Sequence, residues 1–133
     1  MPRCRLVYSR YRMPLFRELR AWQVAKQLAV ECTKAAQAFP GGIRHPLAEQ
    51  LLRAAYSVPL NTAEGCGRRG ARELRRFLDI ARGSLLEVES ALAIARELGY
   101  VPPQQFARLD ALTSETGKTL WGLLRKVSER ARP

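Results

Sequence analysis

Long apolar runs are missing from this sequence of 133 residues. The longest unbroken one, residues 91–95, is far shorter than the roughly 20 residues that a membrane-spanning helix needs. The basic first residues have no apolar segment behind them, so they do not form a secretory signal. We therefore expect a cytoplasmic protein that makes no contact with a membrane.

Metal ligands and disulfide partners are scarce as well. The chain has three cysteines, Cys4, Cys32 and Cys66, without C-x-x-C spacing, and one histidine, His45. An odd number of cysteines at these spacings favours neither a disulfide framework nor a zinc site. A di-metal centre in a helical bundle uses Glu-x-x-His pairs on two helices, and this chain has none. We predict no metal and no cofactor, with Cys32 and Cys66 as small core residues.

Acidic residues are few for a chain this basic. The sequence has 23 Lys and Arg against 12 Asp and Glu, which gives a net charge of +11. A small domain needs a net charge of only about 2–8 for solubility, so the excess predicts an anionic partner. Residues 1–14 carry Arg3, Arg5, Arg10 and Arg12 and no acid, and we expect a basic, mobile arm there. One interpretation of this arm is that it grips nucleic acid.

The remaining residues, 15–130, have the apolar pattern of four helices and no strand pattern. Apolar residues recur at spacings of three and four over about 17–38, from Pro46 to the glycines at 65–70, over 71–98 and over 104–129. Short connections between them favour an all-α fold, an up-down-up-down antiparallel four-helix bundle. The residues predicted to face the core are Trp22, Ala25, Ala29, Cys32, Ala36, Phe39, Leu47, Leu51, Ala54, Val58, Leu74, Phe77, Ala81, Leu85, Val88, Leu92, Ala95, Leu98, Phe106, Leu109, Thr113, Thr116, Leu120, Leu123 and Val127.

Pro59 lies inside the second predicted helix. It removes one backbone hydrogen bond and crowds the carbonyl of Ala55, which costs about 3 kcal/mol in an ordinary helix. We predict a kink near residues 55–59, or a break with Ser57 capping a second segment. Further along the chain, Gly83 and Ser84 predict a point where another helix approaches the third helix closely.

Polar side chains gather around this proline on one side of the predicted helix. We interpret them as a structural network in which Asn61 or Ser57 bonds the backbone that Pro59 frees, and Glu64 pairs with the arginine four residues on. An active site is the alternative interpretation. The members of the predicted network are Ser57, Asn61, Glu64, Ser84 and Glu87.

Five arginines fall within nine residues at the turn between the second and third helices. They are Arg68, Arg69, Arg72, Arg75 and Arg76. Because Leu74 and Phe77 point inward, the arginines on this helix should project away from the core, where they can contact phosphate groups. The alternative is a solvated face partly neutralised by Glu73 and Asp79. No aromatic residue is interleaved with the arginines, so base stacking is not predicted.

Several motifs, in this order, resemble a known family. They are Phe16-x-x-Leu19-x-x-Trp22-Gln23, Phe39-Pro40, Gln50-Leu51-x-Arg53-Ala54-Ala55-x-Ser57-Val58-Pro59-x-Asn61-x-Ala63-Glu64-Gly65, Arg76-Phe77-Leu78-x-Ile80-Ala81-Arg82-Gly83-Ser84-Leu85-x-Glu87-x-Glu89 and Leu98-Gly99-Tyr100. Together they are similar to the bacterial 23S rRNA intervening-sequence proteins. The resemblance covers roughly residues 16–127.

The resemblance implies a four-helix bundle that assembles as a homopentamer, encoded within insertions in the large ribosomal RNA gene. It also implies kinship with the accessory protein of diversity-generating retroelements, a basic pentameric barrel that works with a reverse transcriptase and nucleic acid. It carries over no catalytic residues. Small helical RNases of the HEPN type use an Arg-x4–6-His motif, but Ala38, Phe39 and Pro40 stand where that arginine would precede His45. We therefore predict no enzymatic activity.

Apolar residues outside the main stripe of the third helix predict self-association. They are Ile80, Leu86 and Ile94. Scattered surface apolar residues are the alternative. The sequence thus predicts a basic oligomer that binds RNA or DNA through phosphate contacts with little sequence preference. An oligomeric scaffold for a protein partner, without nucleic acid, is the second hypothesis.

Overall fold

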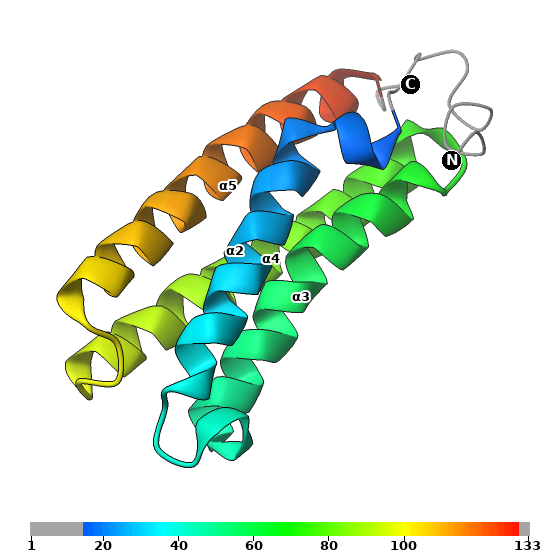
Figure 1. Cartoon of the computed structure of the whole chain (residues 1–133). Coiled ribbons are helices and arrows are strands. Elements are labelled where there is room, and N and C mark those ends of the chain that lie inside the picture. Colours follow the sequence, from blue (N-terminus) through cyan, green and yellow to red (C-terminus); the bar gives the residue numbers. More distant parts are fainter. Residues whose placement is uncertain (1–14, 131–133) are drawn as a thin grey trace.

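The computed structural model describes residues 15–130 and contains four long helices. They are α2 (Arg20–Gln37), α3 (Pro46–Cys66), α4 (Gly70–Glu97) and α5 (Pro103–Arg130), with the short 3-10 turns η1 (Phe16–Glu18) and η2 (Gly42–Arg44) before α2 and α3. No strand occurs in these residues, and the predicted four-helix bundle is confirmed (Figure 1). The arm predicted for residues 1–14 lies outside the described residues.

Contacts between the first and last helices show how the bundle closes. Arg20, at the start of α2, pairs with Glu115 of α5. Glu31, near the end of α2, accepts a hydrogen bond from Arg108 at 3.1 Å. Since the later residue of α2 meets the earlier residue of α5, the two helices run antiparallel. Figure 1 shows the chain reversing direction at each of the three connections.

The helix boundaries differ from the predicted ones mainly at the start. The first helix was expected from about Arg17, but it begins at Arg20 because Phe16–Glu18 forms a 3-10 turn and Leu19 is extended. Pro46 begins α3 as predicted. Gly41 and Gly99, which follow α2 and α4, have φ angles of +78° and +76°, a conformation that glycine adopts readily.

The core lies between the four helices and largely follows the predicted stripes. One prediction is wrong: Leu98 is 54% exposed, because α4 ends at Glu97 and Gly99 turns the chain away. Four other predicted residues are only partly buried and pack against the core from its edge: Trp22, Leu47, Phe106 and Leu123. Leu112 and Leu124 are buried although they were not predicted. Cys32 and Cys66 are buried as predicted, and burial, followed by the charge of Glu31, raises the pKa of the Cys32 thiol to about 12. None of the helices within residues 15–130 is long and apolar enough to span a membrane.

Pro59 is buried inside α3, which continues through it from Pro46 to Cys66. The predicted break, with Ser57 capping a second segment, is therefore wrong. The neighbouring side chains bond the backbone around the proline: Asn61 donates to the carbonyl of Ser57 at 2.9 Å, and Thr62 to that of Val58 at 2.8 Å. The carbonyl that Pro59 deprives of its usual partner belongs to Ala55, so Asn61 does not replace that bond. A kink at this point stays a prediction.

Of the glycines Gly65 in α3 and Gly83 in α4, Gly65 lies tightly against the neighbouring helix and Gly83 does not. A Cβ atom on Gly65 would lie 2.8 Å from Leu74 Cδ1 and 3.1 Å from Phe77 Cβ. A Cβ atom on Gly83 would meet nothing within 4 Å among the described residues, so the prediction for that glycine is wrong. Ser84, beside it, does lie at the helix contact, because its hydroxyl is 2.7 Å from that of Ser57.

Three rings join the two connections at one end of the bundle. The ring centroids of Phe39, His45 and Tyr100 lie 5.1 to 6.0 Å apart, with tilted or edge-on packing. His45 also caps α3, since its Nδ1 accepts a hydrogen bond from the Leu47 N–H at 3.0 Å. We call this ring cluster, Phe39, His45 and Tyr100, the tied end. The turn between α3 and α4 lies at the opposite end (Figure 1).

Candidate nucleic-acid interface

The five predicted arginines all lie around the α3–α4 turn. Gly67 is the C-cap of α3, and Arg69 is the N-cap of α4, which makes no capping hydrogen bond with its side chain. All five side chains are exposed. We call this group the arginine end, consisting of Arg68, Arg69, Arg72, Arg75 and Arg76.

Three of these arginines have acidic neighbours. Arg68 bonds Glu64 at 2.7 Å, and Arg76 bonds both carboxylate oxygens of Glu73 at 3.1 and 3.3 Å. The Arg76 hydrogen bond holds the pKa of the Glu73 carboxyl below its usual value. Arg75 lies 3.9 Å from a carboxylate oxygen of Asp79.

The remaining two, Arg69 and Arg72, have no acidic partner within residues 15–130. The arginine end therefore carries both unpaired and paired guanidinium groups. Exposed ion pairs are worth only about 0–1 kcal/mol, so a phosphate group can compete with the carboxylates for the paired arginines. Glu73 and Asp79 neutralise part of the positive charge of the arginine end, as the alternative interpretation predicted. The neutralisation is incomplete because Arg69 and Arg72 have no acidic partner in the described residues.

Phe77 holds two of the guanidinium groups in place. The guanidinium carbon of Arg68 lies 5.0 Å from the centre of the Phe77 ring, and that of Arg76 lies 4.5 Å from it. The ring itself is buried between the helices. Because each guanidinium contacts both a ring and a carboxylate, less side-chain freedom is lost when it binds a phosphate.

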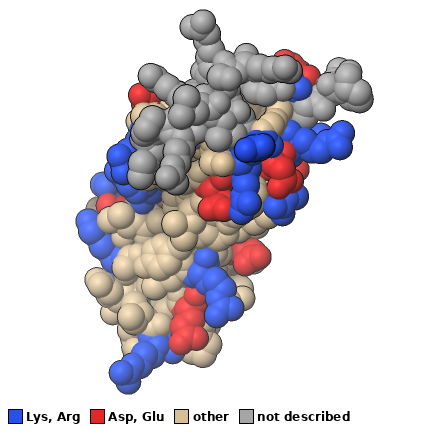
Figure 2. Space-filling view, turned by 90° about the vertical axis from the view of Figure 1, so that its right-hand side faces the viewer, with Lys and Arg blue, Asp and Glu red and all other residues tan. Residues whose placement is uncertain are grey.

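One face of the molecule shows how the charges are distributed. In Figure 2, basic side chains stand beside acidic ones at both ends of the visible face, and an uncharged area lies between them. A continuous basic stripe is not visible on this face. The contacts available to a polyanion on this face are therefore separate groups of basic side chains with acidic neighbours.

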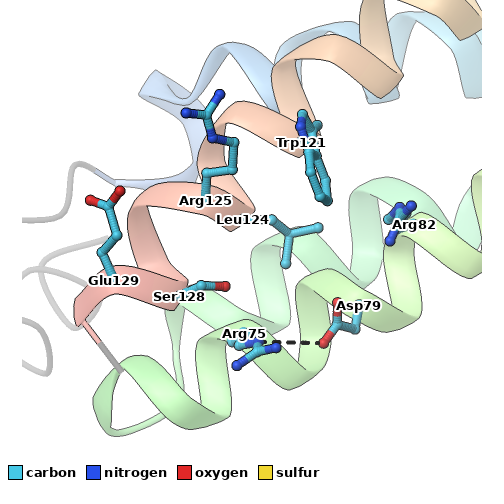
Figure 3. A pocket seen from close by; sticks show the side chains of 8 residues that line it. All are labelled: Arg75, Asp79, Arg82, Trp121, Leu124, Arg125, Ser128 and Glu129. Atoms are coloured by element: carbon cyan, nitrogen blue, oxygen red, sulfur yellow. Dashed lines mark ion pairs between the residues drawn. The ribbon is translucent and has the colours of Figure 1, made fainter. Parts of the chain in front are cut away.

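A pocket between α4 and α5 adds an aromatic residue to this arginine surface. Trp121 of α5 is half exposed and extends toward α4, where the guanidinium carbon of Arg82 lies 4.9 Å from its ring centre (Figure 3). Arg75 belongs to both the pocket and the arginine end. The residues that line the pocket are Arg75, Asp79, Arg82, Trp121, Leu124, Arg125, Ser128 and Glu129.

Trp121 therefore lies in the same pocket as Arg75, a proximity that the sequence analysis did not indicate. Trp121 was missed because it comes from a different helix and is far from the arginine cluster in the sequence. The sequence did contain a signal for Trp121. It lies between Leu120 and Leu124, which belong to the buried stripe of α5, but it does not itself fall on that stripe. A large aromatic residue that the core does not bury is more informative than one that it does.

Three of the five predicted network residues are brought together. The Ser57 hydroxyl bridges the Ser84 hydroxyl at 2.7 Å and the Asn61 amide at 2.9 Å, and Glu64 pairs with Arg68 as predicted. Glu87 is exposed and makes no hydrogen bond within the described part of the chain. Neither a buried polar side-chain atom without a partner nor a cluster of three potential metal ligands occurs among residues 15–130. The Ser57–Ser84 contact joins α3 to α4.

The three apolar residues predicted for self-association are exposed, but they do not share one face of α4. Ile80, Leu86 and Ile94 are 40%, 58% and 48% exposed. At about 100° per residue, Ile80 and Ile94 lie within about 40° of each other, whereas Leu86 lies about 80–120° from both. Ile94 also lines a hollow with Leu47 and Glu87. Two separate surfaces of α4 are therefore apolar.

A family model described as 23S rRNA-intervening sequence protein matches residues 17–122. The matched segment includes α2, α3 and α4 and most of α5, and therefore all of the site residues discussed above except Leu124, Arg125, Ser128 and Glu129. No curated protein matches the chain.

Proposed function

The chain belongs to the family of 23S rRNA-intervening sequence proteins, and we propose that it is a non-catalytic, oligomeric bundle that binds RNA or DNA through phosphate contacts. The observation that carries this proposal is the arginine end. It presents five exposed guanidinium groups over one turn and the beginning of one helix, within a chain of net charge +11.

The position of the arginines on α4 favours phosphate as their ligand. Gly70 begins α4 with no side-chain cap from Arg69, so the first N–H groups of the helix are available to an anion. Arg69 and Arg72 lie in the same turn without acidic partners in the described residues. A phosphate group at this point would receive bidentate guanidinium bonds and the favourable field of the helix terminus.

Exposed arginines spread along a helix contact the backbone of a nucleic acid, and such contacts carry little sequence information. We therefore propose binding with little sequence preference.

Self-association would multiply these contacts. Ile80, Leu86 and Ile94 expose apolar area on α4 that a second copy could cover. A homopentamer, the assembly that the family resemblance implies, would present the arginine end five times. Several weak contacts made at once to one nucleic acid bind it more tightly than a single contact does, which is the effect called avidity.

Binding across a salt series tests the proposal. The probes are an RNA and a duplex DNA of unrelated sequences, titrated with native protein from about 50 to about 200 mM salt, a range over which phosphate binding weakens steeply. The test variant changes Arg68, Arg69, Arg72, Arg75 and Arg76 to Gln. A matched control removes five exposed charges elsewhere, by changing Arg44, Arg53, Arg96, Lys118 and Lys126 to Gln.

We expect micromolar or tighter binding with a steep salt dependence, lost in the test variant and mostly kept in the control. Equal losses in both variants would show that net charge, not the arginine end, is responsible. Absence of binding by the native protein at low salt would reject the proposal.

A scaffold for a protein partner is the second candidate function, and the exposed apolar residues favour it. Leu60 on α3 and Ile94 on α4 are exposed, and each lines a shallow hollow. An apolar interface responds little to salt, so the same salt series distinguishes the two functions.

A further inference from the structure

We propose that the pocket between α4 and α5 binds an unpaired base of the nucleic acid, stacked on Trp121. This inference rests on the proposed function and adds to it a preference for single-stranded segments. It follows from the pocket's size, its aromatic residue, its mixed charges and its connection with the arginine end.

The size of the pocket suits one nucleotide. Its volume is about 410 Å³, near the small end of the range of about 300–1,000 Å³ for ligand pockets. It is open on one side and formed by one face each of α4 and α5 (Figure 3). A duplex does not fit into such a space, whereas a single base turned out of a strand does.

Trp121 is available for stacking because its side chain is not buried in the core. Leu120 and Leu124 fill the interior on either side of it, and half of the indole surface is exposed. Arg82 lies against the indole, which limits the orientations of the ring. Bases stack on aromatic rings and on guanidinium planes, so the Arg82–Trp121 pair offers both kinds of surface.

The charges around the ring suit a nucleotide better than a bare anion. Arg75 and Arg82 come from α4, and Arg125 lies on the α5 rim. Asp79 and Glu129 also line the pocket. Guanidinium groups bind the phosphates next to a base, while carboxylates accept hydrogen bonds from its amino groups or from a ribose hydroxyl.

Arg75 connects the pocket with the arginine end. Its contact with Asp79, at 3.9 Å, is longer than a normal hydrogen bond, so its guanidinium is easily redirected to a phosphate. A strand whose phosphates lie along the first turns of α4 therefore passes beside Trp121. In a duplex the bases are paired and stacked within the helix, so only a single-stranded segment can reach the indole.

The test compares a single-stranded oligonucleotide with a duplex of the same sequence, for native protein and for Trp121→Ala, Trp121→Phe and Trp22→Phe. The chain has two tryptophans, Trp22 and Trp121. Trp22→Phe is therefore the matched control, and it leaves Trp121 as the sole tryptophan, which is excited selectively at wavelengths that tyrosine does not absorb. Sedimentation and thermal melting establish that each variant keeps its assembly and fold.

We expect Trp121→Ala to bind the single strand about tenfold more weakly and the duplex unchanged, since a base loses its stacking partner. Trp121→Phe should retain most of the single-strand affinity. In the Trp22→Phe protein, single strands should quench the Trp121 fluorescence and duplexes should not.

The failures of the two proposals are distinguishable. If native protein binds neither polymer, the proposed function fails and this inference fails with it. If both polymers bind and Trp121→Ala binds them as native protein does, only this inference is overturned. A change in assembly mass for Trp121→Ala would assign Trp121 to a contact between copies and would also overturn it.

Discussion

The two ends of the bundle are built from different chemistry. At the tied end, Phe39, His45 and Tyr100 pack their rings together and so join the α2–α3 connection to the α4–α5 connection. At the arginine end, the single α3–α4 turn carries exposed guanidinium groups whose partners are exposed carboxylates. The tied end presents packed rings and a helix cap, whereas the arginine end presents exposed charges to water over the buried ring of Phe77.

Because of this difference, the tied end is expected to stabilise the fold, whereas the arginine end is the part that we propose binds phosphate. Buried ring contacts contribute several kcal/mol, whereas exposed ion pairs contribute about 0–1 kcal/mol. The tied end is therefore expected to keep the helices in register, which leaves the arginine end free to exchange its carboxylate partners for phosphate. Substitutions at the two ends should have opposite consequences.

The largest expected effect is that of Phe39→Ala at the tied end. Phe39 is 3% exposed, so its loss leaves a cavity and should lower the free energy of unfolding by about 3–5 kcal/mol. Arg72→Ala at the arginine end should change it by less than about 0.5 kcal/mol. Urea unfolding followed by circular dichroism measures both. Equal losses would mean that the two ends do not differ in stability.

The next largest effect concerns a tight helix contact at the arginine end, where Gly65 of α3 lies against α4. Gly65→Ala forces a Cβ against Leu74 and Phe77 and should cost about 1–3 kcal/mol by overpacking. Gly83→Ala is the matched control, since its Cβ meets nothing within 4 Å in the described chain. It should stabilise the helix by about 0.5–1 kcal/mol. If both substitutions shifted the melting temperature in the same direction, the close approach at Gly65 would be refuted.

A smaller effect separates the two roles of His45. His45→Ala removes the cap of α3 and should cost about 0.5–2 kcal/mol. His45→Asn keeps an acceptor for the Leu47 N–H while losing the ring contacts, so it should cost less. Thermal melting compares the two variants. Equal destabilisation would assign the contribution of His45 to the rings alone.

The smallest expected effect concerns Glu73. Glu73→Gln releases Arg76 and should tighten nucleic-acid binding about two- to fivefold at low salt. Glu89→Gln, an exposed acid elsewhere on α4, is the control. A fluorescence binding titration measures both, and equal gains would point to net charge alone.

The same pair predicts a dependence on pH. Because Arg76 lowers the pKa of Glu73 in the folded protein, their pairing stabilises the fold above the ordinary carboxyl pKa. That contribution is lost as the pH falls through the lowered value. Arg76 is then free for phosphate, so the advantage of Glu73→Gln should disappear in that range.

Much of the fold could be predicted because helical periodicity reflects burial directly. Leu74, Val88 and Leu120 recur at helical spacing and are buried. Pro59 was less predictable, since its effect depends on its surroundings: it lies buried within a helix whose neighbouring side chains, Asn61 and Thr62, bond the adjacent carbonyls. The rule that a proline breaks a helix describes a helix surrounded by water, and it does not describe a proline packed between the helices of a bundle.

The candidate site could be predicted only where it is contiguous in the sequence. Arg68 and Arg76 are close along the chain, so the cluster was visible as a pattern. Trp121 joins Arg75 and Arg82 only through the packing of α5 on α4. Gly65 and Gly83 look alike in the sequence, and only the position of α4 against α3 distinguishes them.

The ion pairs between α2 and α5 have a consequence for synthesis on the ribosome. Arg20 and Glu31 are made before their partners Glu115 and Arg108, which belong to α5. The bundle therefore cannot close until α5 has been made. A nascent chain that ends before α5 exposes the apolar stripes of α2 and α4 to water, and in that interval a chaperone would recognise it as unfolded.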